Sequence, residues 1–256
     1  MFAAAWLDRV VDVGPIGWGL LVAAPFVGSF LGVLVRRLPA GRPVVWARSH
    51  CESCGRVLAV RDLVPLLGWL AARGRCRFCG ARLGWFDPAI ELAATAVALV
   101  AVVADGGPLT WLDCLFGWWL LALGCIDLRC WLLPDALTLP LVVAGLFAAL
   151  WLDPASLTNA ALGAALGYLG LRLVAAIYRG LRGSDGVGEG DAKLLAAAGA
   201  WLGAAALPQV ILLAASAALA VALGLRLVGI RLGPRSPVPF GPFLALATWV
   251  LWLFPG

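Results

Sequence analysis

Residues 208–228 read PQVILLAASAALAVALGLRLV, an apolar run that contains one charged residue, Arg226. About 20 apolar residues in a helix cross the roughly 30 Å hydrocarbon core of a bilayer, so this run predicts a transmembrane helix. Hydrophobic residues make up 63% of the chain and charged residues 13%, which excludes a soluble domain. We therefore expect an all-α integral membrane protein with about eight transmembrane helices. The other seven candidate spans are 15–35, 88–104, 110–126, 135–152, 156–178, 191–207 and 240–254.

The arginines predict how these helices are oriented. Ten arginines fall between residues 36 and 85, and the loops near Arg129, Arg179 and Arg226 contain more. The alternate loops contain no Lys or Arg. Because basic residues accumulate in cytoplasmic loops, we expect both termini to be external. The net charge of +5 then reflects topology, so we expect no nucleic-acid partner, although the arginines of the large loop could contact anionic membrane lipid. The predicted domains are a first helix (1–35), a cytoplasmic domain (36–87) and seven transmembrane helices (88–256).

Two CxxCG motifs lie in the cytoplasmic stretch, Cys51–Cys54 and Cys76–Cys79, with 21 residues between them. Two residues between cysteines let a tight turn direct both thiolates at one ion, and the following glycine permits the backbone turn. A polar domain this small needs a staple of this kind. Four thiolates fill the coordination sphere of zinc and leave no place for a reacting water. The motifs predict a structural zinc site. The alternative is four unrelated or disulfide-bonded cysteines.

Two aspartates are candidates for catalysis. Asp127 ends an apolar run, and Asp191 opens the span at 191–207 after the glycines 186, 188 and 190. The predicted topology places both at the cytoplasmic ends of their helices, at similar depth. An ionisable side chain there indicates function, although each could simply reach out to water. Because an anion is favoured at a helix N-terminus, we expect Asp191 to act as the base and Asp127 to hold the proton. Such a pair has the chemistry of an aspartic protease.

Three neighbouring residues complete this interpretation. Gly188 and Gly190 would keep the backbone before Asp191 unwound and close to an extended peptide. Asp135, in the sequence Leu133–Pro134–Asp135, competes with Asp127 as the first aspartate. We expect Asp135 instead to cap the helix at 135–152.

These motifs together resemble the type IV prepilin peptidases, bacterial membrane enzymes of the GxGD group of aspartic proteases. The likeness also includes GSFLGVLVRRLP at 28–39, the Leu-Pro-Asp sequence, GEGDAKL at 188–194 and PFGPFL at 239–244. The two catalytic aspartates of that family fall in its ID and GxGD motifs, which here are Asp127 and Asp191. The resemblance implies a bacterial inner-membrane enzyme that removes a basic leader from prepilins or pseudopilins after a glycine, on the cytoplasmic side.

Many members of that family then methylate the new N-terminus with S-adenosylmethionine. Where the family commonly has Asn after its Gly-Ser-Phe-Leu element, this chain has Gly32, which leaves methylation open. Two other functions would use some of the same residues. An ion-coupled transporter could bind its ion at Asp127 and Asp191, and a membrane scaffold of a secretion complex could use the zinc domain alone.

Overall fold

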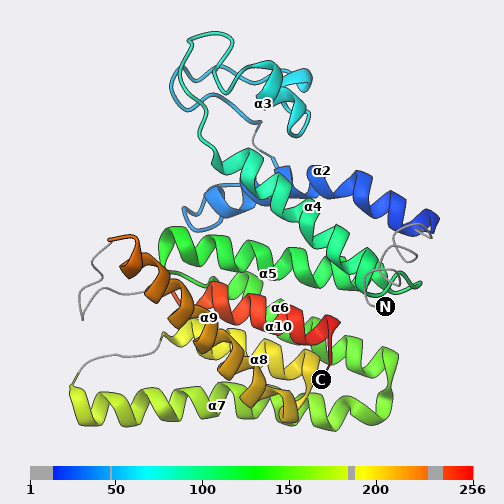
Figure 1. Cartoon of the computed structure of the whole chain (residues 1–256), viewed down its shortest axis with the longest axis vertical. Coiled ribbons are helices and arrows are strands. Elements are labelled where there is room, and N and C mark those ends of the chain that lie inside the picture. The colour runs from blue at the N-terminus through cyan, green and yellow to red at the C-terminus, as the bar shows by residue number, and fades with distance from the viewer. Residues whose placement is uncertain (1–13, 47, 184–187, 230–238, 256) are drawn as a thin grey trace. The chain divides into compact units, whose positions relative to one another are not determined.

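The computed structural model describes residues 14–46, 48–183, 188–229 and 239–255, and within these it contains helices and no β-strand (Figure 1). Among the described residues α3 (Leu67–Ala71) is a short α-helix, and 3₁₀ turns lie at Val60–Asp62, Pro154–Ser156 and Ala204–Ala206. The long helices are α2 (Pro15–Arg37), α4 (Phe86–Ala104), α5 (Thr110–Cys130), α6 (Asp135–Leu152), α7 (Leu157–Arg182), α8 (Glu189–Leu202), α9 (Leu207–Leu227) and α10 (Gly241–Leu253).

Six of these helical segments are long and apolar enough to cross a membrane, while α8 and α10 are shorter. Large apolar side chains are also exposed on helix faces against which no other part of the described chain packs. On α7 they recur at helical spacing at Leu162, Leu166, Leu169 and Leu173, each more than half exposed. Such a stripe suits lipid. The prediction of an all-α, multi-pass membrane protein with a cysteine cluster between its first two spans is confirmed.

The chain divides into two compact units, Met1–Trp118 and Trp119–Gly256. In the first unit α2 and α4 pack closely at Gly28, where an added Cβ would lie 2.6 Å from the Cα of Glu91. In the last turn of α2, the Arg36 guanidinium donates to both oxygens of Asp87, at 2.5 and 3.0 Å. A glycine contact and a bidentate ion pair therefore join the two helices that flank the cysteine region.

The second unit is built around α8, which packs against α6, α7 and α10. Seven consecutive residues of this helix, 194–200, are buried. Gly163 of α7 and Gly199 of α8 lie so close that a Cβ on either would meet the backbone of the other helix. The Trp201 Nε1–H donates to the Leu141 carbonyl of α6 at 2.9 Å. Small residues allow this close packing of helices in an apolar environment.

One sequence prediction differs from the observed helix boundaries, and two others fall outside the described residues. The sixth span was expected to begin at Asp191, but α8 begins at Glu189 and places Asp191 in its first turn. Gly188, the residue before α8, is its N-cap residue and has an extended backbone. The predicted external N-terminus and Gly186 of the glycine run lie outside the described residues.

Candidate active site

Asp127 lies in the last turn of α5 and is 6% exposed. Its Oδ2 accepts a hydrogen bond from the backbone N–H of Gly241 at 3.0 Å. Gly241 is the first residue of α10, so this N–H has no partner within its own helix. A Cβ on Gly241 would lie only 2.7 Å from the same oxygen. Glycine at this position therefore lets the α10 N-terminus approach the carboxylate.

Asp191 is partly buried on the first turn of α8, with its Oδ2 beside Gly188. Both aspartates belong to the second unit, and two contacts link the segments that carry them: α8 packs against α10, whose first residue donates to Asp127, and Gly190 meets Leu133. Each also lies at the N-terminus of a helix: Asp191 at that of α8, and Asp127 at that of α10. The position of Asp127 at the C-terminus of α5 therefore does not decide which aspartate holds the proton. The assignment of base and acid stays a prediction.

The two glycines before Asp191 differ in what they do. Gly188 is extended, with φ −69° and ψ 145°, and immediately precedes the helix. Gly190 is helical, so the unwound backbone predicted before Asp191 does not include it. An added Cβ on Gly190 would lie 2.8 Å from the Cβ of Leu133. The reason for a glycine at position 190 is therefore space for the chain between α5 and α6.

The predicted capping role of Asp135 is wrong. Pro134 is the N-cap residue of α6, and no side chain caps this helix end. The Asp135 carboxylate instead accepts a hydrogen bond from the Lys193 ammonium of α8, with 2.7 Å between Oδ1 and Nζ. A neighbouring cation satisfies the carboxylate, so it does not need to turn back to its own backbone.

The cysteine region forms two knuckles of the same design. In the first, Cys51 N–H donates to Arg56 O at 2.8 Å and Gly55 N–H donates to Cys51 O at 2.9 Å. In the second, Cys76 N–H donates to Ala81 O and Gly80 N–H to Cys76 O, at the same two distances. Both glycines have positive φ, +69° and +71°, which explains the CxxCG pattern.

The four sulfur atoms, those of Cys51, Cys54, Cys76 and Cys79, lie within 4.8 Å of one another. The Cys51 and Cys79 sulfurs are 3.9 Å apart. Four thiolates at about 2.3 Å from one tetrahedral zinc ion would be about 3.8 Å apart. The predicted cluster is therefore formed, and its geometry fits zinc.

The thiols differ in how readily they ionise. Backbone N–H groups of Cys54 and Ser53 donate to the Cys51 sulfur and lower the pKa of this thiol to about 6. At Cys79 the Ala81 N–H acts in the same direction, but burial and the three other thiols outweigh it and raise the pKa to about 11. Four thiolates this close repel one another unless a cation lies between them, which is the environment that zinc supplies.

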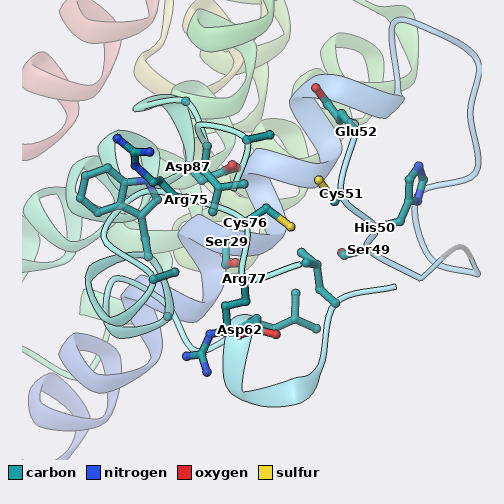
Figure 2. Close-up of a pocket in the computed structure, with 18 of the residues that line it drawn as sticks. Ser29, Ser49, His50, Cys51, Glu52, Asp62, Arg75, Cys76, Arg77 and Asp87 are labelled. Carbon is teal, nitrogen blue, oxygen red and sulfur yellow. Dashed lines mark ion pairs between the residues drawn. The ribbon is translucent and has the colours of Figure 1, made fainter. Parts of the chain in front are cut away.

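A cavity of about 260 Å³ lies in the first unit, between the knuckles, α2 and the start of α4 (Figure 2). Arg36, Arg75 and Arg77 contribute positive charge to its lining, and Asp87 and Glu91 contribute negative charge. The Trp69 indole also lines it, and the buried Nε1–H of this indole has no acceptor among the described residues. The cavity can therefore accept a ligand that carries both charges and a hydrogen-bond acceptor.

Comparison with known families identifies both units. A sequence model of the type IV leader peptidase family matches residues 114–223, which include both aspartates. A second model, of the bacterial peptidase A24 N-terminal domain, matches residues 22–104, which include the four cysteines. The chain belongs to the type IV leader peptidase family. This assignment favours a peptidase over the transporter and scaffold alternatives.

Curated relatives of the peptidase support this assignment over most of the chain. The prepilin leader peptidase/N-methyltransferase of Burkholderia pseudomallei (strain 1026b) is 43% identical over 252 residues, which cover 88% of this chain and 81% of the relative. The proteins of the same name from Aeromonas hydrophila and Dickeya chrysanthemi are 40% and 39% identical over 256 and 253 residues. Those alignments cover 89% of this chain and 87% and 89% of the relatives. No solved structure matches the chain.

Sequence reasoning assigned no role to two residues, one that contacts Asp127 and one that lies on the first turn of α8 with Asp191. Gly241 lies in the quoted motif PFGPFL, but its role depends on Asp127, 114 residues earlier in the chain. Lys193 lies two residues after Asp191 and pairs with Asp135, 58 residues earlier. Two signals in the sequence could have indicated them. One is a glycine beside proline at the start of a helix, and the other is a lysine in the first turn of an apolar helix.

We expect Gly190→Ala to reduce cleavage of a prepilin by about tenfold or more, because the new methyl group would displace the first turn of α8 from Leu133 and carry Asp191 with it. Gly180→Ala is the matched control, since a Cβ there meets open space. Cleavage rates and membrane insertion of both purified variants make the comparison. Equal rates would show that the contact at Gly190 does not position Asp191.

Proposed function

We propose that this protein removes the basic leader peptide of prepilins and pseudopilins on the cytoplasmic side of the bacterial inner membrane, after a glycine, with Asp127 and Asp191 as the catalytic residues. The observation that carries the proposal is that the leader peptidase match includes both aspartates, and that α8, which carries Asp191, packs against α10, whose first N–H donates to Asp127. The relatives are named for this activity. A basic leader also suits a site with two carboxylates.

In the proposed reaction one carboxylate is ionised and the other holds a proton. The ionised group accepts a proton from a water molecule as its oxygen attacks the peptide carbonyl, while the protonated group donates to the carbonyl oxygen. When the bond breaks, a carboxyl group donates a proton to the leaving amine. The peptide bond and one water become a carboxylic acid and an amine. The Gly241 N–H keeps one oxygen of Asp127 oriented throughout.

We further propose that Cys51, Cys54, Cys76 and Cys79 hold one structural zinc ion on the cytoplasmic side. The sulfur spacing and the paired knuckles support this assignment. All four positions of a tetrahedral ion would be occupied, so the zinc would order the loop without activating water. With this loop in the cytoplasm, the positive-inside pattern favours both termini in the periplasm, and the arginines of the loop would contact anionic lipid at the membrane surface.

The cavity of the first unit is the proposed site for S-adenosylmethionine, the methyl donor implied by the names of the relatives. Its residues fit such a molecule. Glu91 suits a positive sulfonium or ammonium group, and Arg75 suits the carboxylate. The Trp69 Nε1–H could donate to an acceptor of the ligand. The bound molecule would supply an activated methyl group for the new N-terminal amine.

Asp127→Asn and Asp191→Asn should each lower cleavage by at least about a thousandfold, because an amide cannot exchange the proton that the reaction needs. Each variant should still insert and fold, since the amide conserves size. Mass spectrometry of a synthetic prepilin incubated with the purified proteins measures the product. Full cleavage by either variant would exclude the proposed pair.

Metal analysis should find one zinc ion per native chain. Cys76→Ser should lose that ion, and the segment 48–85 should become sensitive to protease. Prepilin cleavage should decrease less than protease resistance does, because an ion with no vacant coordination position does not take part in the reaction. Cys125→Ser, outside the cluster, is the control and should keep its zinc. The assignment is wrong if the native protein contains no zinc and all four thiols react freely with an alkylating reagent.

Gly32→Asn should change methylation while leaving cleavage within about twofold, because Gly32 belongs to the first compact unit and both aspartates to the second. A Cβ at position 32 would lie 3.2 Å from the Asp87 Oδ1, so the new amide acts on a carboxylate that lines the cavity. Masses of the mature pilin report methylation, and binding of S-adenosylhomocysteine by calorimetry reports the cavity directly. A parallel loss of cleavage and methylation would refute this separation.

A further inference from the structure

The chain between α5 and α6 lies across the first turn of α8. Leu133 is buried, and its Cβ occupies the space that a side chain at Gly190 would need. Leu133 follows Asp127 by six residues, and Gly190 directly precedes Asp191. This contact therefore joins the two chain segments that carry the aspartates.

An ion pair lies beside this contact. The Lys193 ammonium is 2.7 Å from Asp135 Oδ1 at the start of α6 and 3.0 Å from Glu189 Oε1 in its own helix. The side chain of Lys193 is 18% exposed, whereas those of Asp135 and Glu189 are 58% and 54% exposed. The lysine is thus the enclosed member. Of these two carboxylates, Asp135 is the one that links α8 to another helix.

The first turn of α8 is the part of the site that most needs such a link. Asp127 is buried and is held by the Gly241 N–H. Asp191 lies in the opening turn of a short helix, where intrahelical hydrogen bonding is incomplete. A displacement of about 1 Å can cost a catalytic group much of its rate.

We propose that Lys193 is a positioning residue, which together with Asp135 and the Leu133–Gly190 contact fixes Asp191 relative to Asp127. We call these four residues the α6–α8 clasp. The inference rests on the proposed peptidase function and adds a residue that acts through Asp191 without touching the substrate. Exposed ion pairs add little to stability, so the clasp should affect turnover more than the unfolding temperature.

The test compares Lys193→Met, Asp135→Asn and their double variant with Glu189→Gln, using the full-length protein and a synthetic prepilin. Glu189→Gln is the matched control, because it removes a partner of the same lysine without cutting the link between helices. We expect Asp135→Asn and Lys193→Met each to lower kcat by about tenfold, with KM within about twofold. The double variant should fall no further than the singles, since the pair acts as one unit. Lys193→Arg should recover most of kcat.

Several outcomes would overturn the inference. Native kcat in Asp135→Asn would do so alone, and this variant is informative even if Lys193→Met does not fold. Equal losses in Glu189→Gln and Asp135→Asn would mean that the local charge matters and the link does not. A rise in KM with unchanged kcat would indicate substrate binding instead. Absence of cleavage by the native protein would refute the proposed function, and the clasp with it. Cleavage by the native protein with no loss in the variants would refute the clasp alone.

Discussion

The close packing of one short helix, α8, is the constraint on which the second unit depends. Its buried face consists largely of alanine, glycine and leucine, and Gly199 meets Gly163 of α7 backbone to backbone. In lipid no hydrophobic force favours helix association, so contact at this range is what holds such helices together. Because α8 packs against α6, α7 and α10, it is held beside the helix whose first N–H donates to Asp127. A larger side chain in this packing would move Asp191 away from its partner.

The first unit solves a different problem. Its polar segment is too small to build a hydrophobic core of its own, and the two cysteine knuckles hold its turns together. The Arg56 guanidinium lies over the Phe78 ring, 4.7 Å from its centre, and so connects one knuckle to the other. Arg36 and Asp87 tie the ends of α2 and α4 where this segment leaves the membrane helices. The resulting cavity carries charges of both signs beside an unsatisfied indole N–H.

The sequence predicts those features that depend on composition and spacing. Each candidate span corresponds to a helix, and the CxxCG motifs form matched knuckles, because apolar run length and the turn preference of glycine act locally. Features that depend on distant contacts were missed or misread. Asp135 was expected to cap α6 because Lys193 was not known to be near it. Gly190 was predicted to keep the backbone unwound, whereas it is helical and leaves room for Leu133. Gly241 could be assigned a role only once Asp127 was found against it.

The central claim is that Asp127 and Asp191 act as one catalytic pair. The most direct test is the residual single-turnover rate of prepilin cleavage in the double variant Asp127→Asn/Asp191→Asn, compared with each single variant. Residues that act as a unit show losses that do not multiply, so the double variant should cleave no more slowly than the slower single variant. A double variant whose loss equals the product of the two single losses would contradict the account, because the aspartates would then contribute independently.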